Sequence, residues 1–197
     1  SFLTAAIATN SHVTVQRCPI NFLRVELLRL EKMGCKFRIS KPYFAENKRT
    51  ELVDITNLEV GELRAPEDKI AALTHPGINM DNLPFFVPIV ARAKGTTLIH
   101  DWSYEDRALY FTELRKLGVD VKLADPHRAF VTGPSKFEAA DLNAPPALRP
   151  AVIMLITMLA APGTSILRNI YSITRGYEDF AERLNSLGAH ITVLRDI

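Results

Sequence analysis

The sequence predicts a mixed α/β (α+β) domain made of three helix–strand–helix–strand repeats, with the helices packed inside and the sheets outside. Two observations lead to this prediction. The pattern Leu-x-x-(Leu/Met)-Gly, followed by an alternating strand, recurs at Gly34, Gly118 and Gly188. Each time the glycine closes an amphipathic helical segment that follows an apolar one. We expect a single domain over 1–197, with these repeats: about 1–75, 76–146 and 147–197.

The first repeat begins with an apolar helix over 2–8 and a short strand over 13–15. A second helix is predicted over 20–33, because apolar residues recur there at the helical period. The alternating residues 35–39 form the next strand. Residues 40–75 are the least regular part of the chain, with a strand predicted over 50–56.

The second repeat opens with an apolar helix over 83–93, in which Pro88 predicts a kink or a late start. An amphipathic helix follows over 105–117. Alternation and turn residues predict the other elements: strands over 95–99, 119–123, 128–132 and 137–140, and a turn over 143–146.

The third repeat contains the most apolar helix, over 151–161, with Pro150 at the first helical position. This helix is too short to cross a bilayer, which needs about 20 residues. A strand is predicted over 165–167. The run Arg175-Gly-Tyr-Glu-Asp179 opens a second helix that ends at Gly188, and 189–193 alternates as a half-buried strand.

The composition argues against several function classes. The 24 basic and 22 acidic side chains give a net charge of +2, which predicts no affinity for nucleic acid or a membrane surface. Neither a signal peptide nor a Gly-x-Gly-x-x-Gly motif or P-loop is found. Cys18 and Cys35 lack metal-ligand spacing and indicate a reducing cytoplasm. We expect no metal and no cofactor, and a chain cut from a longer protein, because Ser1 directly precedes a helix.

Three arginines mark predicted helix starts: Arg107 in the first turn, and Arg149 and Arg175 just before their helices. A cation there opposes the helix dipole and costs about 0.3–1 kcal/mol. If the helix ends converge, guanidinium and backbone N–H groups together form a site for phosphate or carboxylate. The alternative is three unrelated surface arginines that pair with nearby acids such as Asp106 or Glu178.

Asp81 precedes an apolar helix, and composition alone favours a helix cap at this position. Beside clustered arginines, the same carboxylate can accept a proton from a substrate hydroxyl. The two interpretations differ in what the side chain should contact.

Four segments resemble the enolpyruvyl transferases, most closely those acting on UDP-N-acetylglucosamine: Pro76–Asp81, Tyr104–Gly118, Leu148-Arg149 and Ile170–Asp179. The run Arg-Gly-Tyr-Glu followed by Leu-x-x-Leu-Gly-Ala is the most specific. In that family two similar domains, each of three repeats, close over the substrates. This chain resembles the domain with the C-terminal end. The reactive cysteine belongs to the other domain, and neither Cys18 nor Cys35 matches it.

The resemblance implies an enolpyruvyl (carboxyvinyl) transferase domain of cytoplasmic peptidoglycan precursor synthesis, inactive without its partner domain. The implied substrates are UDP-N-acetylglucosamine and phosphoenolpyruvate. Asp81 matches the aspartate that contacts the sugar hydroxyl and serves in proton transfer, and Ser103 a position whose backbone touches the nucleotide sugar. Arg107, Arg149 and Arg175 match arginines around phosphoenolpyruvate and the closing interface.

Three positions depart from the family pattern. Ala147 stands where the family usually has Asp, and Ser172 and Thr174 where His and Asp are common. Two alternatives therefore stay open. One is a shikimate-pathway enolpyruvyl transferase domain, against which the Arg-Gly-Tyr-Glu run argues. The other is a degenerate, non-catalytic binding domain. An RNA-end cyclase of similar topology is disfavoured by the near-neutral charge.

Overall fold

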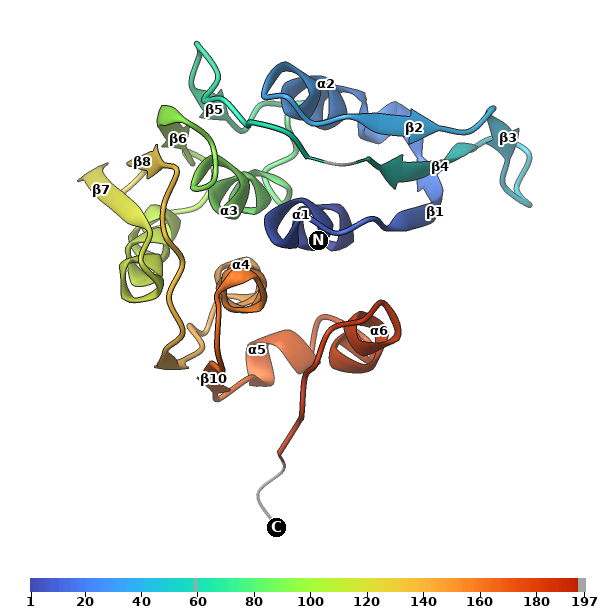
Figure 1. The fold of residues 1–197 in the computed structure, drawn as a ribbon. Coiled ribbons are helices and arrows are strands. Elements are labelled where there is room, and N and C mark those ends of the chain that lie inside the picture. Colours follow the sequence, from blue (N-terminus) through green and yellow to red (C-terminus); the bar gives the residue numbers. More distant parts are fainter. Residues whose placement is uncertain (59, 195–197) are drawn as a thin grey trace.

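The computed structural model describes residues 1–58 and 60–194. Three helices lie together at the centre: α1 (Phe2–Thr9), α3 (Val87–Val90) and α4 (Leu148–Ala160). The strands form three separate sheets around them (Figure 1). The predicted fold class, with helices inside and sheets outside, is confirmed. In the described ranges, no helix is both long and apolar enough for a membrane crossing.

The first sheet is built around β4 (Glu51–Asn57), which pairs antiparallel with three other strands. Its partners are β1 (Thr14–Pro19), β2 (Phe37–Ile39) and β3 (Tyr43–Phe44). The helix predicted over 20–33 is divided into a 3-10 turn, η1 (Ile20–Phe22), and the α-helix α2 (Arg24–Lys32). Arg17, at positive φ, lies within an irregularity of β1.

The second sheet has the strand order β5-β6-β8-β7. Its strands are β5 (Ile70–Ala71), β6 (Gly95–His100), β7 (Asp120–Asp125) and β8 (Arg128–Gly133). The amphipathic segment is a 3-10 helix, η3 (Arg107–Leu117), that packs against β7 and α4.

The apolar helix predicted over 83–93 is confirmed in part: residues 83–90 are helical with a break close to Pro88, as expected, and residues 91–93 lie outside the helix. The chain forms a 3-10 helix, η2 (Leu83–Phe86), and then the single turn α3. Pro84 and Pro88 lie within the first two positions of these elements. Proline lacks the N–H that continues a helix, so each proline restarts the helix instead of extending it.

The third sheet pairs β9 (Asp141–Asn143) in parallel with β10 (Ile166–Arg168). The strand predicted over 137–140 and the turn over 143–146 are therefore misplaced. Pro150 is the third residue of α4, not the first. The helix expected from Arg175 onward begins only at Phe180, as α6 (Phe180–Ser186), and a separate short helix, α5 (Tyr171–Thr174), ends directly before Arg175. The prediction that Arg175 marks a helix start is therefore wrong. Residues 189–193 form no strand, because no described strand pairs with them.

The three glycines of the repeated pattern end their helices as predicted. Gly34, Gly118 and Gly188 have φ of +106°, +81° and +97°, a backbone conformation that other L-residues adopt at a steric cost.

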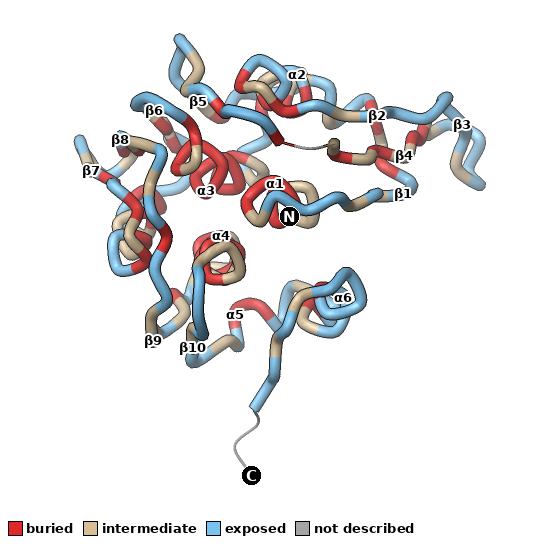
Figure 2. Tube along the Cα trace, viewed as in Figure 1, coloured by how far each residue is buried: buried red, intermediate tan, exposed pale blue. Residues whose placement is uncertain are grey.

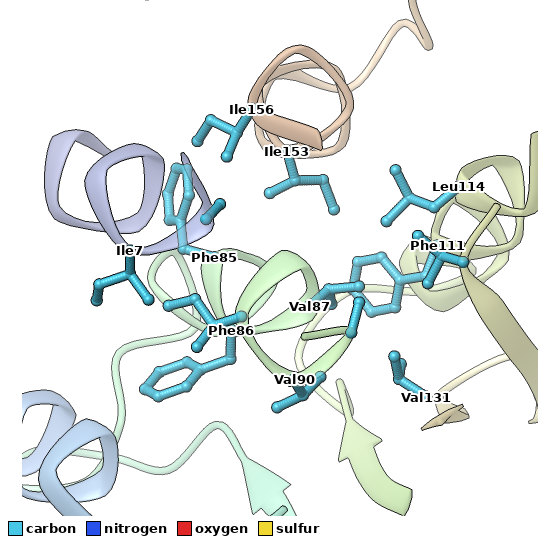
Figure 3. Packing of buried hydrophobic residues seen from close by; sticks show 14 of the residues in the cluster. Ile7, Phe85, Phe86, Val87, Val90, Phe111, Leu114, Val131, Ile153 and Ile156 are labelled. Atoms are coloured by element: carbon cyan, nitrogen blue, oxygen red, sulfur yellow. The ribbon is translucent and has the colours of Figure 1, made fainter. Parts of the chain in front are cut away.

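The main core lies where the central helices meet. Buried residues concentrate on α1, α3 and α4, and exposed ones on the outer strands and loops (Figure 2). Side chains from four segments converge there: Ile7, Phe85, Phe86, Val87, Phe111, Leu114, Ile153 and Ile156 (Figure 3). Burying each such side chain contributes about 1.5–3 kcal/mol relative to leaving it in water. This core fixes the helix ends from which the candidate site projects.

Candidate functional site

Asp81, Arg107 and Arg149 meet in one cluster, although they come from different parts of the chain. Asp81 lies in the loop before η2, Arg107 is the first residue of η3, and Arg149 is the second residue of α4. Asp81 Oδ2 lies 3.1 Å from Arg149 Nη2, and Asp81 Oδ1 lies 4.0 Å from Arg107 Nη1. One carboxylate thus lies between two guanidinium groups.

The contacts of Asp81 decide between the two interpretations of this residue. Asn82, not Asp81, occupies the cap position of η2, and no side chain caps that helix. The Asp81 side chain is 42% exposed and pairs with the arginines. Its backbone N–H donates to Asn79 Oδ1 at 2.8 Å. The helix-cap interpretation is therefore wrong.

Arg107 is held by a buried partner that sequence reasoning missed, Asp101. The Asp101 side chain is fully buried; its Oδ2 accepts from Arg107 Nε, and its Oδ1 accepts from Nη2 at 2.9 Å. Arg107 Nη2 also donates to the Met80 carbonyl at 2.6 Å, and the guanidinium stacks 4.1 Å from the Tyr104 ring centroid. This bidentate pairing leaves Nη1 to face Asp81.

The surface pairing that was the alternative for Arg107 does not occur. Asp106 takes positive φ at the start of η3 and pairs with no arginine among the described residues. The signal that could have indicated Asp101 is its position directly after β6. A carboxylate at a buried strand end requires a cationic partner nearby.

Arg149 lies inside the first turn of α4, not before it. A cation at this end of a helix is unfavourable on its own, because it opposes the helix dipole. Its pairing with Asp81 offsets that cost. The Arg149 side chain stays 31% exposed to solvent. Ala147 caps α4 without a side-chain hydrogen bond, so the helix start relies on neighbours for its polar contacts.

Arg175 is exposed and follows α5; the ion pairs described for 1–58 and 60–194 do not include it. Its expected surface partner Glu178 pairs instead with Arg183 at 2.7 Å. The adjacent Gly176 packs on α4, since a Cβ there would lie 2.5 Å from Leu148 Cδ2. The backbone next to Arg175 therefore lies against Leu148, the residue that precedes Arg149.

Ser103 lies in the loop between β6 and η3, between Asp101 and Arg107. Its Oγ is buried and has no hydrogen-bond partner within the described part of the chain. Next to it, Trp102 donates its indole N–H to the Ala72 carbonyl. The loop is thus anchored on both sides of Ser103.

The cysteines are poor candidates for nucleophiles. Both are free and buried. Burial raises the pKa of Cys35 to about 12 and also raises the pKa of Cys18. Since the thiolate is the reactive form, both thiols are inert at neutral pH. Outside residues 59 and 195–197, no group of three or more His, Cys, Asp or Glu is arranged to hold a metal ion.

Comparison with known proteins specifies the family to which this fold and this cluster of two arginines and two aspartates belong. Residues 1–184 match EPSP synthase (3-phosphoshikimate 1-carboxyvinyltransferase), and the chain belongs to this family. UDP-N-acetylglucosamine 1-carboxyvinyltransferase of Campylobacter lari is 31% identical over 100% of this chain. The enzyme of the same name from Treponema denticola is 38% identical over 62% of it. The chain covers 43% and 29% of these relatives, respectively, so it spans less than half of their length.

Solved structures agree. The enolpyruvyl transferase NikO from Streptomyces tendae superposes with a TM-score of 0.79 at 26% identity, over 96% of this chain and 42% of that one. EPSP synthase from Acinetobacter baumannii gives 0.75 at 16% identity, over 98% and 47%, which is a likeness of fold alone. The resemblance to the enolpyruvyl transferase family is confirmed.

Proposed function

We propose that this chain is one domain of a UDP-N-acetylglucosamine enolpyruvyl transferase of cytoplasmic peptidoglycan precursor synthesis. The observation that carries the proposal is the placement of Asp81 between Arg107 and Arg149. The names of the relatives support the nucleotide sugar as substrate. Phosphoenolpyruvate is the donor, and a second domain supplies the reactive cysteine.

The proposed reaction joins the sugar 3-hydroxyl to the enol carbon of phosphoenolpyruvate. The hydroxyl oxygen bonds to C2 while C3 takes up a proton; then the C2–O bond to phosphate breaks and C3 loses a proton. Asp81 accepts the hydroxyl proton, and Ser103 contacts the nucleotide sugar. Charge on the donor's phosphate and carboxylate is stabilised by Arg149 and Arg175. Arg107, fixed by Asp101, orients Asp81.

The domain repeats follow the same proposal. We assign one domain to 1–197 with repeats over about 1–75, 76–146 and 147–197, each ending a helix at a positive-φ glycine. The second and third repeats each place a site arginine at a helix start: Arg107 in η3 and Arg149 in α4. Without the other domain the substrates stay open to water on one side, so we propose that the chain alone does not turn over.

Calorimetry tests the substrate. We expect UDP-N-acetylglucosamine to bind the chain, with binding lost in Asp81→Ala and retained in Asp54→Ala, a carboxylate on the first sheet. Preferential binding of shikimate 3-phosphate would indicate the shikimate-pathway alternative. Binding of neither ligand, even with the complementary domain of the Campylobacter lari relative added, would indicate the degenerate domain. If the chain needs the second domain for activity, phosphate should be released in that mixture and not by the chain alone.

A further inference from the structure

We propose that Glu26, in the first repeat, is a positioning residue for the Asp81 loop; this inference rests on the proposed function. Glu26 lies in α2 and is only 7% exposed. Its Oε1 accepts two hydrogen bonds, from the Asn79 backbone N–H at 3.2 Å and from Asn82 Nδ2 at 2.9 Å. These two donors lie on either side of Asp81 in the sequence. One carboxylate oxygen of Glu26 therefore holds both ends of the loop 79–82 against α2.

The hydrogen bonds continue to Asp81 itself. Asn79, fixed through its N–H by Glu26, accepts the Asp81 N–H with its side-chain Oδ1 at 2.8 Å. From the opposite side, Arg107 Nη2 donates to the Met80 carbonyl at 2.6 Å. Glu26 and Arg107 thus hold the loop from two different repeats. This double attachment sets the direction in which the Asp81 carboxylate leaves the backbone toward Arg149.

The cost of burying Glu26 supports a specific role. A buried carboxylate is unfavourable unless donors compensate it, and an apolar residue would pack at the same position without that requirement. The two donors found for Glu26 are neutral amides of the Asp81 loop, not a cation. The charged residue therefore serves to specify the conformation of the loop more than to strengthen the helix packing.

The test compares variants of Glu26 by calorimetry with UDP-N-acetylglucosamine. Glu26→Leu keeps a similar volume but removes the acceptor, so affinity should fall by about tenfold. Glu26→Gln keeps an oxygen that accepts both bonds and should restore affinity to within about threefold. Glu31→Leu, at an exposed position of the same helix, is the matched control and should leave affinity unchanged.

Amide hydrogen exchange tests the role of Glu26 without any ligand, because it reports directly on the hydrogen bonds of the Asp81 loop. The Asn79 and Asp81 amides should lose protection in Glu26→Leu and keep it in Glu26→Gln, while amides of α4 stay protected in both. If the wild-type chain does not bind the nucleotide sugar, the proposed function fails and the exchange pattern still decides the role of Glu26. If Glu26→Leu binds as the wild type does, or its loop amides stay protected, the positioning role is overturned.

Discussion

The ion pair between Arg107 and Asp101 fixes the orientation of the Arg107 guanidinium in the site. Asp101 is fully buried, and Arg107 is nearly so. We expect Asp101→Asn to lower the free energy of unfolding by about 3–5 kcal/mol, because it removes the only fully buried carboxylate that pairs with the buried Arg107 guanidinium among the described residues. Urea denaturation measures this loss.

The exposed pair Arg168–Asp141 provides the control. It is also bidentate, at 2.8 and 2.6 Å, but its side chains are 58% and 48% exposed. Asp141→Asn should cost much less than Asp101→Asn, since solvent screens the exposed pair. Equal losses of unfolding free energy in the two variants would mean that burial does not strengthen the Arg107–Asp101 pair.

The buried Cys35 thiol makes the stability of the fold depend on pH. Its folded-state pKa of about 12 lies above the unfolded value of 9.0. Its contribution to stability is therefore present below pH 9.0 and is lost as the pH rises toward about 12. We expect no alkylation by iodoacetamide in the folded chain at pH 9.0, and rapid alkylation in urea. Rapid labelling of the folded chain would show that the thiol is not buried as described.

At the scale of elements, Gly176 joins α5 to the start of α4. A methyl group at this position would lie 2.5 Å from Leu148 Cδ2. Because this methyl group would meet only the flexible end of the Leu148 side chain, which can change rotamer, we expect Gly176→Ala to destabilise the fold by about 0.5–1 kcal/mol, as measured by thermal unfolding. Gly61→Ala, which meets nothing within 4 Å, should change stability by less than about 0.5 kcal/mol.

The sequence allowed the periodic elements to be predicted better than the short ones. The central helix α4 and the strands β6 and β7 lie close to their predicted positions, because their apolar periods are strong. The helix expected over 83–93 is shorter and divided, because Pro84 and Pro88 each interrupt it. The strand at 189–193 failed because alternation alone does not supply a neighbouring strand.

The candidate site could be predicted only in part for a related reason. Asp81, Arg107 and Arg149 stood out because each lies near a helix start, and the structure brings these three together. Asp101 carries a weaker signal, its position directly after β6, and Glu26 carries none. Glu26 reaches the Asp81 loop across 53 and 56 residues of sequence, a contact that only the tertiary packing creates.

At the scale of the whole molecule, the three sheets surround one helical core but differ in size. Two sheets have four strands each, and the β9–β10 sheet has two. The core between α1, α3 and α4 is continuous across the repeats (Figure 3). Since a close-packed core transmits shifts between elements, the segments that carry Asp81, Arg107 and Arg149 are positioned jointly by all three repeats.

We propose that side chains from the second and third repeats form one substrate-binding site around Asp81. The most direct measurement is an NMR titration of the ¹⁵N-labelled chain with phosphoenolpyruvate in the presence of UDP-N-acetylglucosamine. We predict amide shifts concentrated at 79–83, 101–107, 147–151 and 175–177. Shifts confined to the first sheet around β3 and β4, with none in these four segments, would contradict the account.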